Sequence, residues 1–143
     1  MRWLSAIIVF LYNLICSAQV IENPVFDRTD TPEFHIDKIE FKEDATIVYC
    51  SCSAEDNSWA NISPNTYLED VTTGEKYTII KSEGLPFIPN TRRFLIAEKY
   101  NIKMSFPCIK TKRKLNFIEN PKEQAFNVFG HCCPLKIAKR SLK

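Results

Sequence analysis

Cysteine is the most reactive residue type that occurs several times in this sequence. The chain contains six cysteines, of which Cys16 lies in an apolar N-terminal stretch. If that stretch is removed, five cysteines remain. Because five is an odd number, at least one thiol is free or pairs with another chain. The candidates for a disulfide or a free thiol are Cys50, Cys52, Cys108, Cys132 and Cys133.

Cys50 and Cys52 are two residues apart in a segment rich in β-formers, so they share one face of a predicted strand with Val48. At that separation their sulfurs are too far apart for an easy mutual disulfide. Two interpretations remain open. Either they are small core residues, or one of them forms a bridge from this strand to Cys132 or Cys133 beside the last predicted strand, which an exported protein would permit.

Redox and metal chemistry have little support in the spacing of these residues. No Cys-x-x-Cys pair occurs, although a redox site would use that spacing at a helix N-terminus to lower a thiol pKa. A metal site could use His131, Cys132 and Cys133 together with Cys50 or Cys52. However, adjacent cysteines rarely direct both sulfurs at one tetrahedral ion, and the spacing of zinc sites is absent. We expect neither a metal nor a cofactor.

Hydrolytic catalysis also lacks a signature. The two histidines, His35 and His131, have no local catalytic motif, and no Gly-x-Ser-x-Gly occurs. The chain has 17 acidic residues, so pairs of carboxylates suited to glycoside hydrolysis arise by chance. We therefore expect no catalytic residues and no enzymatic activity.

A basic run stands between two predicted strands. It consists of Lys110, Lys112, Arg113 and Lys114, and it could form a patch for an anionic partner. The simpler interpretation, which we favour, is a solvated loop. The formal net charge of +2 and the pI of about 8.2 are too mild to predict a nucleic-acid partner.

The N-terminus has the order of an export signal. Arg2 precedes an apolar run over residues 4–15, and Cys16-Ser17-Ala18 fits the small-x-Ala cleavage rule. The run is shorter than the ~20 residues that span a bilayer. We expect a signal peptide over residues 1–18 and a periplasmic, cell-surface or secreted protein without a transmembrane segment. Lipid anchoring at Cys16 is less favoured because Ile15 before it is bulky.

The remaining chain has mostly period-two patterning. Residues 19–33 suggest an extended lead-in, residues 34–131 a strand-rich domain, and residues 132–143 a basic tail. Strands are expected at residues 34–42, 45–54, 67–71, 76–81, 102–106, 115–119 and 125–131, with loops at 56–64 and 82–91. Ile36 and Ile39 break the alternation, which predicts a bulge. About seven short strands indicate an all-β, antiparallel sandwich. The expected core residues are Val48, Trp59, Leu68, Tyr77, Ile102, Met104, Phe106, Phe117, Phe126 and Val128.

Several motifs, taken in order, resemble a family of secreted bacterial immunoglobulin-like domains that often stand before thioredoxin-like domains. The resemblance covers roughly residues 45–130. It implies an immunoglobulin-like sandwich and export, and it brings no catalytic residues. The motifs are Trp59-Ala60-Asn61-Ile62, Tyr67-Leu68-Glu69-Asp70 with Gly74, Ser82-Glu83-Gly84, Phe106-Pro107, Asn116-Phe117-Ile118-Glu119 and residues 125–130.

These observations predict a non-catalytic exported binding or structural module of the bacterial cell envelope. Its partner would be an unknown protein or envelope component. Two alternatives remain open. The chain could be an accessory or remnant domain of a thiol–disulfide redox system, as the family context and the cysteines suggest. It could also carry a small apolar ligand between its sheets, which a cavity above ~300 Å³ would favour.

Overall fold

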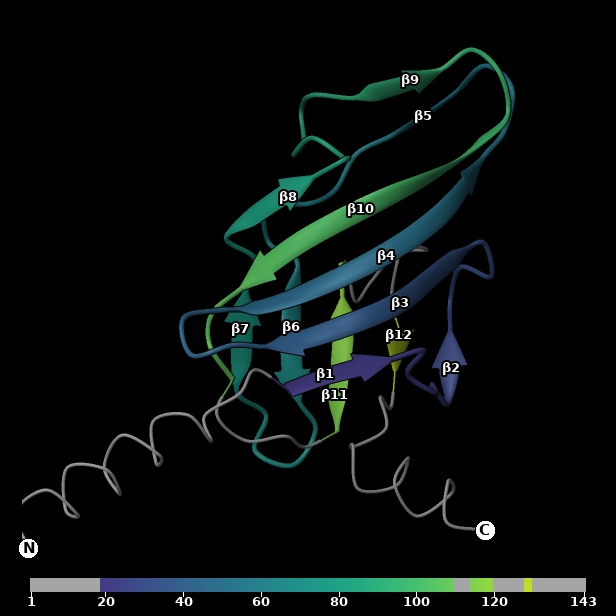
Figure 1. Ribbon diagram of the computed structural model, residues 1–143. Coiled ribbons are helices and arrows are strands. Elements are labelled where there is room, and N and C mark those ends of the chain that lie inside the picture. The colour runs from purple at the N-terminus through teal and green to yellow at the C-terminus, as the bar shows by residue number, and fades with distance from the viewer. Residues whose placement is uncertain (1–18, 110–113, 120–127, 130–143) are drawn as a thin grey trace, which may run out of the picture.

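The computed structural model describes residues 19–109, 114–119 and 128–129 (Figure 1). This part of the chain is all-β, as predicted, and contains no helix. It contains twelve strands rather than about seven, because several are only two or three residues long. The strands are β1 (Gln19–Glu22), β2 (Arg28–Thr29), β3 (Phe34–Phe41), β4 (Thr46–Ala54), β5 (Ser58–Ala60), β6 (Tyr67–Asp70), β7 (Lys76–Thr78), β8 (Lys81–Glu83), β9 (Arg92–Phe94), β10 (Glu98–Phe106), β11 (Leu115–Ile118) and β12 (Val128–Phe129).

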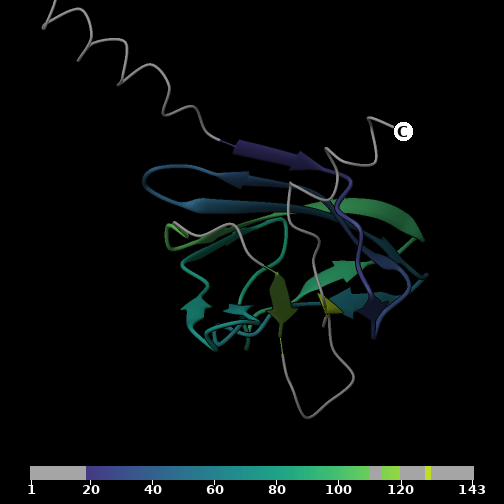
Figure 2. The ribbon, with the colours of Figure 1, turned by 90° about the horizontal axis from the view of Figure 1, so that it is seen from below.

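Two five-stranded sheets face each other, which gives a sandwich-like arrangement (Figures 1 and 2). The first has the order β1-β3-β4-β10-β8 and the second the order β2-β12-β11-β6-β7. In Figure 1 the strands of the second sheet run across those of the first. A third, two-stranded sheet consists of β5 and β9. All pairs between named strands are antiparallel. The segment 19–33, predicted as a lead-in, contributes β1 and β2 to the two large sheets.

The central strands follow the period-two pattern of the sequence. In β10, Ile102, Met104 and Phe106 are buried and alternate with more exposed polar residues. The bulge predicted between Ile36 and Ile39 is confirmed, because the register of β3 against β4 shifts between Ile36 and Lys38. The extra residue re-phases β3, so apolar side chains on both sides of the bulge reach the core.

The core lies between the two large sheets. Phe117 on β11 contacts Phe34 on β3 at a ring-centroid distance of 5.5 Å, and it meets Phe106 on β10 edge-to-face at 6.2 Å. One side chain therefore joins the second sheet to two strands of the first, through one tilted and one T-shaped ring contact. The predicted core residues that are confirmed as buried are Val48, Leu68, Ile102, Met104, Phe106 and Phe117.

The other predicted core residues are not confirmed as buried. Tyr77 is half-buried, and Phe126 and the side chain of Val128 lie outside the described residues. The prediction for Trp59 is wrong, because its side chain is 65% exposed. Residues 56–64 are not the continuous loop that was expected, since β5 lies within them and carries Trp59 outside both large sheets. The loop predicted at 82–91 likewise begins inside β8.

Two glycines occupy left-handed backbone conformations for different reasons. Gly74, at φ +74°, ends the turn of the predicted hairpin between β6 and β7, and a Cβ there would meet open space. Gly84, at φ +98°, follows β8, and a Cβ there would overlap the backbone carbonyl oxygen of Asn101 on β10. Only a glycine therefore lets the chain leave β8 so close to β10.

These two glycines form a matched pair for mutation. Gly74→Ala carries only the cost of a left-handed backbone, and we expect it to lower the free energy of unfolding by about 1 kcal/mol. Gly84→Ala adds a backbone clash, and we expect a loss of about 2–4 kcal/mol. Urea unfolding followed by circular dichroism measures both. Equal losses would contradict the close approach of Gly84 to β10.

Candidate binding site

The candidate site lies at one end of the molecule. A long two-stranded arm, made of the β4–β10 ladder and the β5–β9 ladder, folds back on itself there. β4 and β10 pair from Thr46 and Phe106 as far as Ala54 and Glu98. Four residues further along each strand, Ser58 pairs with Phe94 in the ladder of β5 and β9. The second ladder thus continues the first in the same register. Figure 1 shows β5 and β9 turned back beyond the end of β4 and β10. We call the β5–β9 pair the ribbon.

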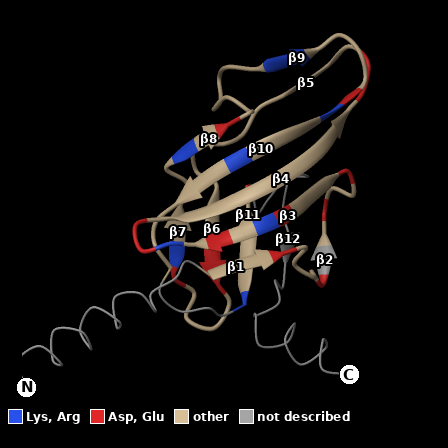
Figure 3. Ribbon diagram, viewed as in Figure 1, with Lys and Arg blue, Asp and Glu red and all other residues tan. Residues whose placement is uncertain are grey.

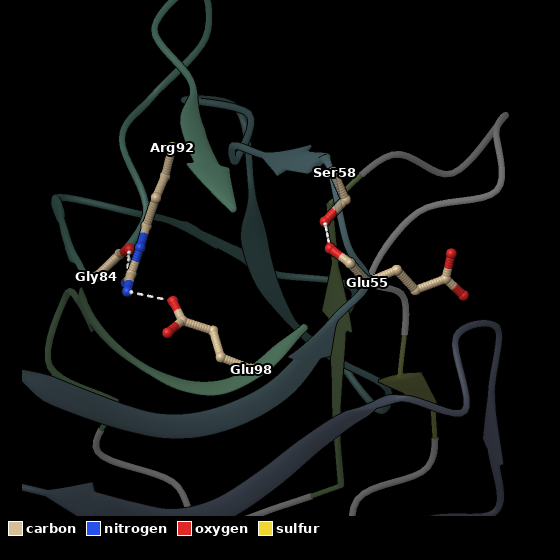
Figure 4. Close-up of polar contacts among 5 residues, drawn as sticks. All are labelled: Glu55, Ser58, Gly84, Arg92 and Glu98. Carbon is tan, nitrogen blue, oxygen red and sulfur yellow. Dashed lines mark hydrogen bonds and ion pairs between the residues drawn. The ribbon is translucent and has the colours of Figure 1, made fainter. Parts of the chain in front are cut away.

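Local hydrogen bonds define the bend between the two ladders. The backbone N–H of Ala97 donates to the Asp56 carboxylate (Oδ1) at 2.6 Å, so a side chain replaces the ladder contact at this point. Asn57 adopts φ +54°, a conformation that asparagine tolerates better than most residues, and its N–H donates to the carbonyl of Leu95 at 3.4 Å. The hydroxyl of Ser58 donates to the carbonyl of Glu55 at 2.6 Å (Figure 4).

Arg92 fastens the ribbon to the rest of the fold. Its guanidinium donates through Nη1 to the carbonyl of Gly84 at 3.0 Å and through Nη2 to Oε1 of Glu98 at 3.3 Å (Figure 4). The same group lies 4.9 Å from the ring centroid of Phe94 and 5.4 Å from that of Tyr100. A planar guanidinium can stack on rings and donate hydrogen bonds at the same time, which a lysine ammonium cannot do. Arg92 therefore links β8, β9 and β10.

A cleft of about 460 Å³ opens between the ribbon and the end of β4 and β10. Phe94 from the ribbon stacks on Tyr100 from β10 at a centroid distance of 4.7 Å, and both side chains are buried. Cys52 and Ala54 from β4 and Ala60 from β5 add further apolar surface. The cleft is lined by Thr31, Glu33, Cys52, Ser53, Ala54, Glu55, Ser58, Trp59, Ala60, Phe94 and Tyr100.

Tyr100 keeps its proton at the floor of this cleft. Burial is the largest cause that raises the pKa of Tyr100, and a hydrogen bond with Cys52 raises it further, while the charge of Arg92 opposes the shift. Because the pKa moves above its usual value near 10, the hydroxyl is neutral at physiological pH. Tyr100 therefore presents a neutral hydroxyl and an aromatic ring, and it does not supply a base.

Two exposed carboxylates stand among the lining residues. Glu33 precedes β3 and Glu55 follows β4. Within the described ranges, no hydrogen bond or ion pair reaches either side-chain carboxylate, and no lysine or arginine lines the cleft. An apolar floor with an acidic rim suits a ligand that is apolar at one end and neutral or positive at the other.

A second hollow, of about 740 Å³, lies on the outer face of the first sheet. The pairing of the five strands places one residue of each strand in a single row. A tyrosine stands at its centre, and on each side of it a lysine is followed by a glutamate. Lys38 lies 4.2 Å from the ring centroid of Tyr49 and also pairs with Glu40 at 3.2 Å, while Lys103 pairs with Glu83 at 3.7 Å. These groups satisfy one another, so this face offers a ligand less than the cleft does. The row consists of Glu22, Lys38, Tyr49, Lys103 and Glu83.

The described cysteines are free thiols. Cys50 and Cys52 are buried and Cys108 is half-buried, so the interpretation as core residues holds for the first two. Neither Cys50 nor Cys52 forms a disulfide in this structure, so the alternative interpretation of a bridge to Cys132 or Cys133 has no support here. Cys132 and Cys133 lie outside the described residues. Burial is the main cause that raises the pKa of Cys50 well above its usual value, and the nearby Asp37 and Cys52 add to the shift.

The predicted basic run and the two histidines do not form a binding site among the described residues. Lys114 pairs with Asp27 at 3.3 Å, and the rest of the basic run, Lys110, Lys112 and Arg113, lies outside the described residues. His35 is exposed on β3, and His131 is not described. Among residues 19–109, 114–119 and 128–129, no three side chains of His, Cys, Asp or Glu gather in a way that could hold a metal ion.

Sequence reasoning missed the main cleft residues. Residues 94–100 gave no clear strand or helix pattern, because the arm bends inside them and shifts the phase of the apolar side chains. The available signal was the aromatic character of Phe94 and Tyr100 on both sides of that segment.

No family model, no curated protein and no solved structure matches this chain. In the part of the chain that is described, no helix has the length and apolar character needed to cross a membrane.

The burial of the thiols predicts their reactivity. The thiolate is the reactive form, so a raised pKa and exclusion of solvent both protect Cys50. In a pulse of iodoacetamide on the native chain, we expect Cys108 to be alkylated at least roughly 100-fold faster than Cys50, and strong denaturant to remove the difference. Peptide mass spectrometry measures each site separately. Equal rates in the native chain would contradict the core position of Cys50.

Proposed function

We propose that this protein is a non-catalytic binding module of the bacterial cell envelope, and that it binds in the cleft between the ribbon and the β4–β10 end. The observation that carries the proposal is the cleft itself. Its volume of about 460 Å³ lies in the range of small-molecule sites, although it is not the cavity between the sheets that the sequence suggested. Phe94 and Tyr100 supply the aromatic surface that such sites use.

The chemistry of the lining narrows the ligand class to an aromatic or aliphatic group with a positive end. The apolar part would be buried against Cys52, Ala60 and Phe94. The positive end would lie near Glu33 or Glu55, whose carboxylates have no partner among the described residues. Such a group belongs either to a free aromatic amine or to neighbouring aromatic and basic side chains of a protein partner.

Exported location and an immunoglobulin-like class belong to the same proposal. Their support is the order of the N-terminal residues and the two antiparallel sheets around one core. Because a simple domain of that class has seven strands, this chain would be a variant in which short edge strands and the ribbon are added. An accessory role in thiol–disulfide exchange has less support, since burial of Cys50 raises its pKa and suppresses its thiolate.

A pair of matched probes tests the cleft. 2-Phenylethylamine and 3-phenylpropionate share a phenyl ring and differ in the sign of the charge. We expect both to bind weakly, with the amine favoured about fivefold because two exposed carboxylates attract it and repel the acid. NMR titration of the full chain measures both affinities. In the Glu33→Gln, Glu55→Gln double variant, we expect the two affinities to become nearly equal.

A filling substitution supplies the second arm of this test. We expect Ala60→Phe to abolish binding of both probes, while Ala45→Phe, in the turn between β3 and β4, leaves binding unchanged. A capped Ala-Phe-Lys-Ala peptide that binds at least tenfold more tightly than the amine would identify a protein as the source of the ligand group, and equal affinity would identify a free small molecule. Absence of probe binding at about 10 mM, or binding that Ala60→Phe leaves intact, would overturn the proposal.

Export makes a separate prediction. The Cys16-Ser17-Ala18 block predicts cleavage after Ala18, so the exported chain should begin at Gln19. N-terminal sequencing and intact mass measure this directly. A first residue of lipid-modified Cys16 would contradict it and would make the protein membrane-anchored.

A further inference from the structure

The outer face of the ribbon and the bend beside it carry a cluster of exposed apolar residues. Trp59 pairs with Arg93 across the ladder, so both side chains lie on the same face of the ribbon. Leu95 and Ile96 come directly after β9, in the bend of the arm. Trp59, Leu95 and Ile96 are 65%, 73% and 76% exposed, whereas Phe94 on the inner face is only 3% exposed. We call Trp59, Arg93, Leu95 and Ile96 the outer patch.

A cluster of large exposed apolar residues of this kind marks an interaction surface. Tryptophan and arginine are also the residues that most often dominate the binding energy of protein interfaces. Single exposed apolar residues elsewhere, such as Ile80 at 63% exposure, do not need this explanation. The outer patch differs because it contains three such residues close together. Trp59 lies in the ladder opposite Arg93, and Leu95 and Ile96 lie in the bend that follows.

Charges of opposite sign lie at the two ends of the outer patch. Arg93 marks one end, and Glu55 and Asp56 in the loop after β4 mark the other. Figure 3 shows β9 in blue and the loop that follows β4 in red. Among the described residues, no ion pair engages Arg93 or the Glu55 carboxylate. The neighbouring Arg92 is already paired with Glu98.

This arrangement is complementary to itself. If a second copy approaches along a two-fold axis with its ribbon antiparallel, the apolar centres meet, and Arg93 of each chain lies at the acidic end of the other. An interface built by a two-fold axis uses the same surface on both copies. A surface with one sign of charge could not pair with itself, because like charges would face each other.

We propose that the outer patch is the interface of a symmetric homodimer, in which Trp59, Leu95 and Ile96 form the apolar centre and Arg93 pairs with Glu55 of the other copy. Trp59 and Glu55 also line the cleft, so this dimer borders it. The dimer rests on the exposed patch and its charges and not on the proposed ligand-binding function. Because the patch is small, the dimer is weak and forms reversibly.

Sedimentation velocity of the full chain tests the dimer over a concentration series from about 5 µM to about 500 µM. We expect the weight-average sedimentation coefficient of the native chain to rise with concentration. Leu95→Glu places a charge in the apolar centre, and we expect it to weaken dimerisation at least tenfold. Ile80→Glu changes another highly exposed apolar residue, outside the patch, and should leave dimerisation unchanged.

A charge exchange tests the two-fold arrangement. We expect Arg93→Glu and Glu55→Lys each to weaken the dimer, because each places like charges opposite each other, and the double variant to restore it. A native chain that stays monomeric over the whole series would overturn the proposal and leave the patch to a different partner. Equal effects of Leu95→Glu and Ile80→Glu, or a double variant that is no better than the single ones, would also overturn it. Probe binding in the cleft, measured on Leu95→Glu, reports separately on the proposed function.

Discussion

The continuity of register from the β4–β10 ladder into the β5–β9 ladder is the constraint on which the candidate site depends. Ala54 pairs with Glu98, and Ser58 pairs with Phe94 four residues further along each strand. Neither strand gains a residue relative to the other, so the two cannot slide past each other at the bend. The bend therefore moves both strands together, and the ribbon returns as a unit over the inner side of the strands that carry it.

Because the arm folds back, the two faces of the ribbon have different surroundings: one faces the cleft and the other faces outward. In a ladder, neighbouring side chains point to opposite faces. The inner face carries Ser58, Ala60 and Phe94, which with Tyr100 enclose the cleft. The outer face carries Trp59 and the residues beside it. Arg92 belongs to the inner set, and its contacts with Gly84 and Glu98 hold the ribbon at the distance that leaves the cleft open.

Those parts of the sandwich could be predicted from the sequence whose patterns lie within a few adjacent residues. Alternation at Ile102, Met104 and Phe106, the broken alternation between Ile36 and Ile39, and the hairpin that ends at Gly74 each follow from a few adjacent residues. The site could not be predicted in this way, because the ribbon pairs two three-residue strands that are far apart in the sequence. Segments of that length carry too little patterning to be recognised, and their pairing is determined by the longer ladder next to them.

Trp59 and Cys50 show how residue type alone misleads about function. A tryptophan is expected in a core because of its large apolar surface, yet the ladder with Arg93 holds Trp59 on the outer face of a narrow ribbon that has no second layer to cover it. A cysteine is expected to be reactive, yet Cys50 faces the core, where burial raises its pKa and suppresses the thiolate. The Cys50 thiol thus lies where its chemistry is suppressed, while the large apolar side chain of Trp59 faces solvent. The placement of these two residues supports the proposed recognition function more than thiol catalysis at Cys50, because recognition uses exposed apolar area, whereas thiol catalysis needs an accessible thiolate.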